Sequence, residues 1–115
     1  RHDSHASLVC EALQAKKHVF VEKPIAVTME GLELVAAAAL SHPEQRLFVG
    51  FNRRFSPFTK DLISGLRTRN APISMIATIN AGAVAPESWV LDPSEGGGRI
   101  IGEVCHFIDL MVALS

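Results

Sequence analysis

Two short and almost continuously apolar segments, each preceded by a segment with helical periodicity, constrain the fold of this chain most strongly. Residues 18–22 read His-Val-Phe-Val-Glu, and residues 47–51 read Leu-Phe-Val-Gly-Phe. Short runs rich in β-branched and aromatic residues are typical of strands that are covered on both faces, as in parallel sheets. We therefore expect two buried, parallel strands.

The segments before these strands carry apolar residues at helical spacing. Asp3 or Ser4 can cap a helix over residues 4–15, and Thr28 can cap a second helix that ends at residues 41–43. The order helix, strand, helix, strand with short connections is typical of an α/β fold with a parallel sheet and right-handed crossovers. Residues 1–52 are therefore predicted to form a doubly wound unit.

The pattern changes beyond Arg53. A short helix is predicted after Pro57, a strand over residues 73–80 from alternating side chains, and a helix over residues 99–114. Arg99, Glu103 and His106 are expected to share one side of that last helix. The glycines at 96–98 form a loop whose backbone can approach another group closely. Residues 53–115 are thus expected to begin a second unit.

Composition excludes several classes of protein. The 115 residues are 48% hydrophobic and 20% charged, which predicts a folded chain. With 11 Lys and Arg against 12 Asp and Glu, we expect no nucleic-acid partner. The longest apolar run, residues 35–40, is far shorter than the roughly 18 residues of a membrane-spanning helix, so we expect no membrane partner. Cys10 and Cys105 lie in apolar segments without ligand spacing, which favours free thiols in the cytoplasm and no metal site.

Glu22-Lys23-Pro24 is the first candidate site, because it stands where the first strand ends and open α/β sheets bind ligands at that edge. A lysine desolvated beside a cationic cofactor ring suits proton exchange with an alcohol or carbonyl. The alternative is a lysine that only pairs with Glu22 or with solvent. The Lys23–Pro24 bond could also be cis.

His106 is the second candidate, with Glu103 three residues before it and Asp109 three residues after it. An imidazole oriented by a carboxylate exchanges protons near neutral pH. The alternative is a surface histidine with acidic neighbours.

Two further candidates belong to the substrate side. Arg53, with Arg54, follows the second strand and can hold an anionic substrate or a cofactor phosphate, or be solvated. Trp89 lies in a loop and can wall a sugar pocket or cover the seam between the two units.

The order and spacing of these motifs resemble the glucose-fructose oxidoreductase, inositol dehydrogenase and rhizopine-catabolism (Gfo/Idh/MocA) family. The matching residues are His5, Lys17–Pro24, Val49–Phe55, Gly96–Gly98 and His106–Asp109. The resemblance implies the C-terminal half of a Rossmann-like NAD(P)-binding domain over residues 1–52 and the start of an α+β substrate and oligomerisation domain over 53–115. It also implies a homo-oligomeric oxidoreductase acting on the hydroxyl of a sugar, sugar nucleotide or cyclitol. Residues 98–109 are similar to members associated with bacterial polysaccharide metabolism.

The resemblance also implies roles for individual residues. Lys23 and His106 would be catalytic. The residues near the nicotinamide of NAD or NADP would be His5, Glu22, Lys23 and Pro24. Arg53 would lie near the junction of the two domains. From their positions in the sequence, and not from the resemblance, we also expect Trp89, Glu103 and Asp109, together with Arg53, on the substrate side.

The chain departs from the family pattern in two places. Many members have Asp four residues before the histidine, whereas this chain has Gly102 there and Glu103 next to it, about 100° further around the helix. Glu103 can replace that acid only if the start of the helix is rotated. The Gly-x-Gly-x-x-Gly turn that holds a pyrophosphate is absent, so we expect this segment to be inactive alone. The competing hypothesis is a non-catalytic, truncated or degenerate module used for assembly.

Overall fold

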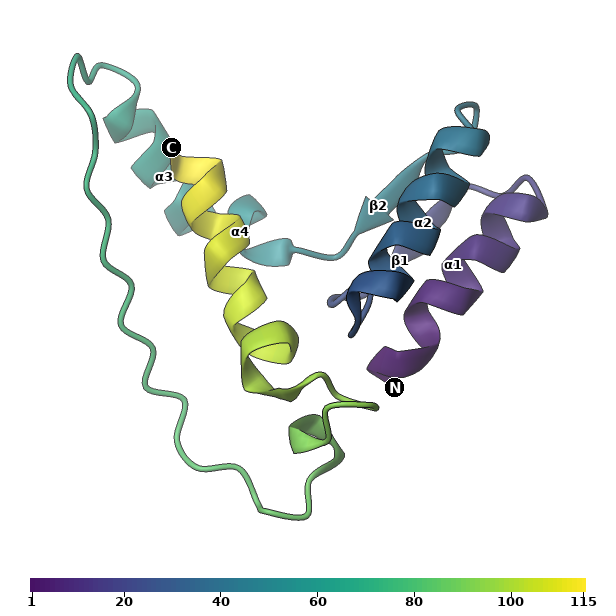
Figure 1. Ribbon diagram of the computed structural model, residues 1–115. Coiled ribbons are helices and arrows are strands. Elements are labelled where there is room, and N and C mark those ends of the chain that lie inside the picture. Colours follow the sequence, from purple (N-terminus) through teal and green to yellow (C-terminus); the bar gives the residue numbers. More distant parts are fainter.

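The computed structural model describes residues 1–115 and contains one sheet of two strands (Figure 1). Strands β1 (Val19–Val21) and β2 (Leu47–Val49) are parallel, and Phe20 lies opposite Phe48 in the register. Two parallel strands, each preceded by a helix, form the α/β arrangement that the sequence predicts, and both strands are confirmed.

Helices α1 (His5–Gln14) and α2 (Met29–Ser41) cover one face of this sheet (Figure 1). The buried side chains between them are Val9, Leu13 and Val35, with strand residues such as Val19 and Leu47 packed against them. The hydroxyl of Thr28 accepts the N–H of Gly31 at 3.1 Å, which satisfies one of the free donors at the start of α2. Both predicted helices and the Thr28 cap are confirmed. The predicted side-chain cap of the first helix is wrong, because Ser4 stands at the N-cap but its hydroxyl donates to the Arg1 carbonyl oxygen.

The opposite face of the sheet is open. Phe20 is 66% exposed and Phe48 is 49% exposed, and their stacked rings lie 5.7 Å apart. The expectation that both strands are covered on both faces is therefore wrong for this chain. Its physical reason is that α1 and α2 pack against each other on the same side, which leaves the alternate strand residues without a cover.

A second group of elements follows β2. It consists of a 3₁₀ turn η2 (Asn52–Phe55), helix α3 (Pro57–Leu66), a π-helical turn η4 (Ile100–Val104) and helix α4 (Cys105–Leu114). The Ser56 hydroxyl caps α3 by accepting the N–H of Thr59 at 3.1 Å. The guanidinium of Arg54 donates to both carboxylate oxygens of Asp109, so η2 is fastened to α4.

The prediction of a strand over residues 73–80 is wrong. These residues are part of a long extended segment between α3 and the 3₁₀ turn η3 (Trp89–Leu91), and they pair with no other strand (Figure 1). Alternating side chains fit an extended backbone, but a strand also needs a neighbour to receive its hydrogen bonds. The sheet of this chain contains only β1 and β2.

The last helix forms where it is predicted, but its geometry differs at the start. The backbone from Ile100 to Val104 makes i to i+5 hydrogen bonds, which displaces the following residues around the helix axis. His106 is only 8% exposed, whereas Glu103 is exposed. The expectation of one shared polar side for Arg99, Glu103 and His106 is therefore wrong.

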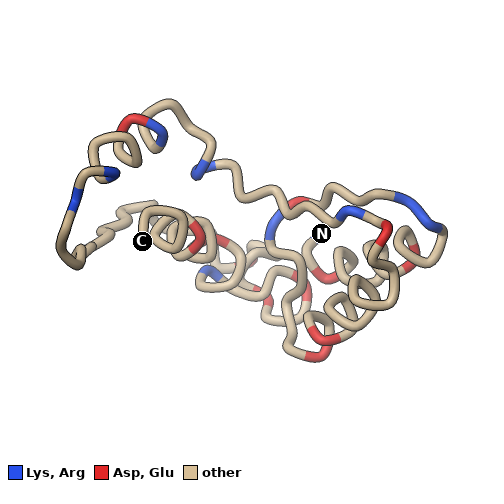
Figure 2. The backbone as a smooth tube through the Cα atoms, turned by 90° about the horizontal axis from the view of Figure 1, so that it is seen from above, with Lys and Arg blue, Asp and Glu red and all other residues tan.

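The molecule is more open than a compact domain of its length. Its radius of gyration is 16.4 Å and it extends 44 × 42 × 22 Å, whereas a compact domain of this size has a radius near ~13 Å. Lys, Arg, Asp and Glu occur in both halves of the chain (Figure 2). No helix has the length and apolar character that crossing a membrane requires.

Candidate functional site

Lys23 extends from the end of β1 to the π turn that precedes α4. Its Nζ donates a hydrogen bond to the carbonyl oxygen of Gly102 at 2.5 Å and lies 3.6 Å from Oε1 of Glu103. Its side chain is 14% exposed, and the Lys23–Pro24 peptide bond is cis. The strand end and the last helical segment are therefore in direct contact through this ammonium group.

Gly102 makes this contact possible because it has no side chain. A Cβ at this position would lie 3.2 Å from the carbonyl oxygen of Gly96 and 3.3 Å from Cε1 of His2. An acidic side chain at position 102, as in the resembled pattern, has little room here. The carboxylate that faces Lys23 comes instead from Glu103, which lies in the π turn. The rotated helix start that this replacement needs is thus present.

His106 is buried one turn further along. The edge of its ring faces Phe51, with ring centroids 6.1 Å apart, and its Nδ1 has no hydrogen-bond partner. Burial lowers the pKa of His106 below 6.5, and the positive charges of Lys23 and Arg53 lower it further, against smaller opposite effects of Glu103 and Glu22. A neutral imidazole with a free nitrogen can accept a proton. The alternative of a surface histidine is wrong, because the side chain is buried.

His5 and Glu22 lie at the same edge of the sheet. The Nδ1 of His5 is 2.7 Å from the carbonyl oxygen of Pro24, so the ring holds the segment that follows β1. The carboxylate of Glu22 lies against the α-carbon of Gly50 at the end of β2, where a Cβ would come within 3.1 Å of Oε2. Their cofactor-binding roles, and that of Pro24, stay predictions.

The glycine loop packs against the chain's own backbone. A Cβ on Gly96 would lie 2.5 Å from the carbonyl oxygens of both Trp89 and Val90. Gly97 and Gly98 have φ values of +76° and +72°, which favour glycine. The close backbone approach expected for this loop is therefore an approach to η3.

Trp89 and Asp109 contact residues other than Lys23. The Trp89 ring contacts His2 edge-on, with centroids 4.9 Å apart, and the guanidinium of Arg1 lies 5.7 Å from its centre. This placement favours the seam-covering alternative for Trp89. Asp109 binds Arg54, and this hydrogen bond raises the pKa of the guanidinium. Roles of both residues in substrate binding stay predictions.

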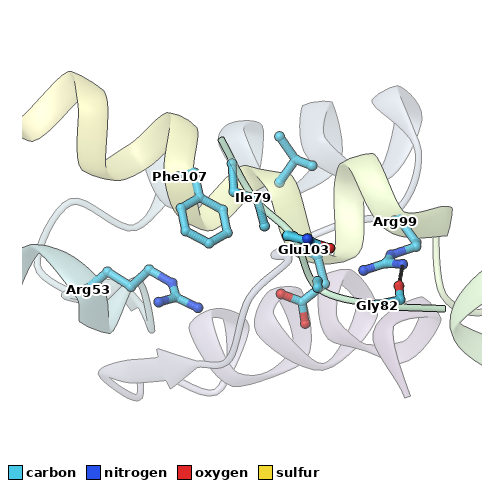
Figure 3. A pocket seen from close by; sticks show the side chains of 9 residues that line it. Arg53, Ile79, Gly82, Arg99, Glu103 and Phe107 are labelled. Atoms are coloured by element: carbon cyan, nitrogen blue, oxygen red, sulfur yellow. Dashed lines mark hydrogen bonds between the residues drawn. The ribbon is translucent and has the colours of Figure 1, made fainter. Parts of the chain in front are cut away.

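A cleft of about 360 Å³ lies beside Glu103 (Figure 3). Its charged lining residues are Arg53, Arg99 and Glu103, and the remaining wall consists of Val104, Phe107 and residues 79–82. The sequence indicates Arg53 and Glu103 as site residues, but it does not indicate Arg99, Phe107 or Asn80. The spacing of Arg99 and Glu103, four residues apart on the last helix, could have indicated Arg99. Nothing in the sequence places residues 79–82 beside that helix.

Comparison with known proteins defines the class. Residues 1–51 match the oxidoreductase family Gfo/Idh/MocA, which is described by its NAD-binding Rossmann fold. The crystal structure of an oxidoreductase domain protein from Kribbella flavida superposes with a TM-score of 0.73 at 31% identity, over 98% of this chain and 32% of that one. These matches define an NAD-binding oxidoreductase fold.

Curated relatives agree with this class. An inositol 2-dehydrogenase/D-chiro-inositol 3-dehydrogenase of Shouchella clausii is 31% identical over 94% of this chain and 30% of its own length. The uncharacterized oxidoreductase YrbE of Bacillus subtilis is 43% identical over 50% of this chain and 17% of its own. The chain belongs to the Gfo/Idh/MocA oxidoreductase family, and it spans less than a third of the length of these relatives.

The residues present fit the nicotinamide end of an NAD(P) cofactor. The unpartnered Nδ1 of buried His106 and the ammonium of Lys23 are polar groups at the carboxyl edge of a parallel sheet, where such folds bind dinucleotides. The chain has no Gly-x-Gly-x-x-Gly turn for the pyrophosphate. These residues therefore account for one end of the cofactor only.

Proposed function

We propose that this chain contributes the nicotinamide-side and substrate-side residues of a dehydrogenase that acts on a hydroxyl group of a sugar, sugar nucleotide or cyclitol. The observation that carries the proposal is the contact of Lys23 with Gly102 and Glu103, because it joins the end of β1 to the helix that bears His106. The similarity to inositol dehydrogenases supports the substrate class. In this proposal residues 1–52 belong to the cofactor domain and residues 53–115 to the substrate domain of a cytoplasmic homo-oligomer.

Lys23 and His106 have different roles at the substrate hydroxyl. Bound NAD(P) supplies the hydride acceptor or donor. The Lys23 ammonium is held by the Gly102 carbonyl and the Glu103 carboxylate, which fix its position at the strand end. In oxidation, the neutral imidazole of His106 takes up the hydroxyl proton while Lys23 stabilises the developing negative charge on oxygen. In reduction the proton returns to the oxygen.

Kinetics of the full-length protein test this assignment. Lys23→Met should lower kcat by about 100-fold or more, the range for loss of a positioned proton-transfer or charge-stabilising group, with NAD and the best substrate of a panel that contains myo-inositol, D-glucose and D-glucuronate. The dissociation constant of NADH, measured by fluorescence, should change by less than about twofold. The reason is that Lys23 is proposed to act on the substrate oxygen in the transition state, and loss of such an interaction lowers kcat. Lys17→Met removes the same charge from an exposed position and should change neither value. Unchanged kcat in Lys23→Met, or a wild-type protein without NADH affinity, would contradict the proposal.

A second candidate function is a non-catalytic assembly module. The exposed face of Phe20, Phe48 and Phe55 favours it, because adjacent uncovered aromatic rings are typical of surfaces buried by a partner. Sedimentation of the chain with Phe48→Glu separates this candidate from the first. If the chain is an assembly module, Phe48→Glu should dissociate the oligomer, and the wild-type protein should not bind NADH.

A further inference from the structure

The cleft beside Glu103 contains an excess of positive charge, although the whole chain has a net charge of −1. Glu103 is its acidic lining residue, and Lys23 lies 3.6 Å from this carboxylate and offsets its charge. Arg53 and Arg99 remain as two cations without an acidic partner (Figure 3). The cleft therefore has the electrostatics of an anion site.

Arg53 is free to bind a ligand. Its side chain makes no hydrogen bond or ion pair in this structure, and its guanidinium carbon lies 4.4 Å from the centre of the Phe107 ring. The aromatic face holds the guanidinium by a cation–π contact and leaves its N–H donors unused. Such a planar fork binds carboxylate or phosphate through two parallel hydrogen bonds.

Arg99 and Asn80 complete the lining on the other side. Arg99 donates one hydrogen bond to the carbonyl oxygen of Gly82 at 2.7 Å, which fixes the guanidinium at the cleft and leaves further N–H groups available. Asn80 is a polar residue in the same wall. A cleft of about 360 Å³ lies within the size range of small-ligand sites.

We propose that this cleft binds one carboxylate or phosphate group of the substrate, with Arg53 as the principal contact and Arg99 as a second cation. The substrate is then an acidic sugar or polyol and not a neutral one. The inference rests on the proposed function, because it names the substrate class of the same site. It makes Arg53 and Arg99 specificity residues and leaves the proton chemistry to Lys23 and His106.

The charge of Arg53 also reaches His106. The groups that act on this imidazole are Lys23 and Arg53, which lower its pKa, and Glu103 and Glu22, which raise it. An anion bound to Arg53 offsets one of the two positive charges. The pKa of His106 should therefore rise when the cleft is occupied, and this change can be observed without turnover.

The experiment is an NMR titration of the 115-residue chain without nicotinamide, at constant ionic strength. D-Glucuronate, D-glucose 6-phosphate and D-glucose are the three probes. At least one of the two acids should bind about tenfold more tightly than glucose or better, as expected for a charge-assisted hydrogen-bond pair. Whichever acid binds more tightly identifies the anionic group, and the pKa of His106 should rise in its presence.

Two variants locate the binding. Arg53→Gln should abolish the preference for the acids over glucose, and Arg67→Gln, which removes an exposed arginine at the end of α3, should retain it. Equal affinities for all three probes would overturn the proposal, as would a preference that survives Arg53→Gln. Because no step uses the cofactor, failure here contradicts only the acidic substrate class, whereas loss of NADH affinity contradicts only the dehydrogenase.

Discussion

At the scale of single residues, glycines determine how closely the last helix approaches the rest of the chain. Gly102 leaves room for His2 and for the Gly96 carbonyl, and its own carbonyl accepts the Lys23 hydrogen bond. Gly96 leaves room for the carbonyl groups of Trp89 and Val90. The site therefore depends on backbone contacts that a single methyl group would disturb.

Gly96→Ala tests this dependence. The added Cβ would lie 2.5 Å from two carbonyl oxygens, so η3 or the glycine loop has to move. The expected cost is about 2 kcal/mol or more in the free energy of unfolding, measured by urea denaturation. Gly65→Ala is the matched control, because nothing lies within 4 Å of that Cβ position in α3. Its expected gain is about 0.5–1 kcal/mol. Equal effects of the two substitutions would show that the loop is not close-packed.

At the scale of elements, the end of α1 contains a strained residue. The N–H of Lys17 bonds to the carbonyl of Ala12 at 3.0 Å and that of Lys16 to Leu13 at 2.9 Å, which is a Schellman motif. Lys16 has a φ of +56°, a conformation that costs energy for a residue with a Cβ. Glycine is the usual residue at this position of the motif.

Lys16→Gly should therefore stabilise the chain by about 0.5–1 kcal/mol, the net of the relieved strain and the greater freedom of glycine in the unfolded state. Thermal unfolding followed by circular dichroism measures it. Lys17→Gly removes the same charge at the next position without relieving strain, so it should not raise the melting temperature. A lower melting temperature for Lys16→Gly would contradict the assigned helix end.

Most elements could be predicted from local pattern. Apolar spacing and the Thr28 cap define α1 and α2, and short apolar runs define β1 and β2. The strand expected at residues 73–80 failed because a ladder requires a second segment, which local alternation does not encode. The π turn at Ile100–Val104 was not predicted either, because a one-residue widening of a helix depends on contacts distant in sequence.

In the candidate site, too, local pattern predicted some residues, whereas others depend on contacts between residues distant in the sequence. Lys23 and His106 were predicted from their positions at a strand end and on a helix, and Lys23 does contact the helical segment that contains Gly102. The sequence did not show that Glu103 would face Lys23, or that Arg54 rather than Arg53 would be engaged with Asp109. Arg53 and Arg54 are chemically identical neighbours whose side chains point in different directions. Which of the two reaches Asp109 depends on the three-dimensional packing.

At the scale of the whole molecule, residues 1–51 contact residues 89–114 through apolar neighbours, such as Phe51 beside His106 and Val27 beside Gly97, and through a few polar groups. Arg1 pairs with Glu95, the His2 ring lies 2.8 Å from the Gly96 carbonyl oxygen, and Lys23 binds Gly102. The extended segment before η3 adds no sheet between the two groups (Figure 1). The Lys23 contact is therefore central, because it brings the strand end and the helix with His106 together.

The titration of His106 by NMR tests this juxtaposition most directly. Burial is the largest cause of the lowered pKa of His106, the positive charges of Lys23 and Arg53 lower it further, and Glu103 and Glu22 oppose them. Lys23→Met should therefore raise the pKa of His106, and the imidazole would remain protonated to a higher pH. Lys17→Met serves as the control and should leave it unchanged. A His106 pKa that is the same in Lys23→Met and the wild-type chain would show that the two side chains do not share a site.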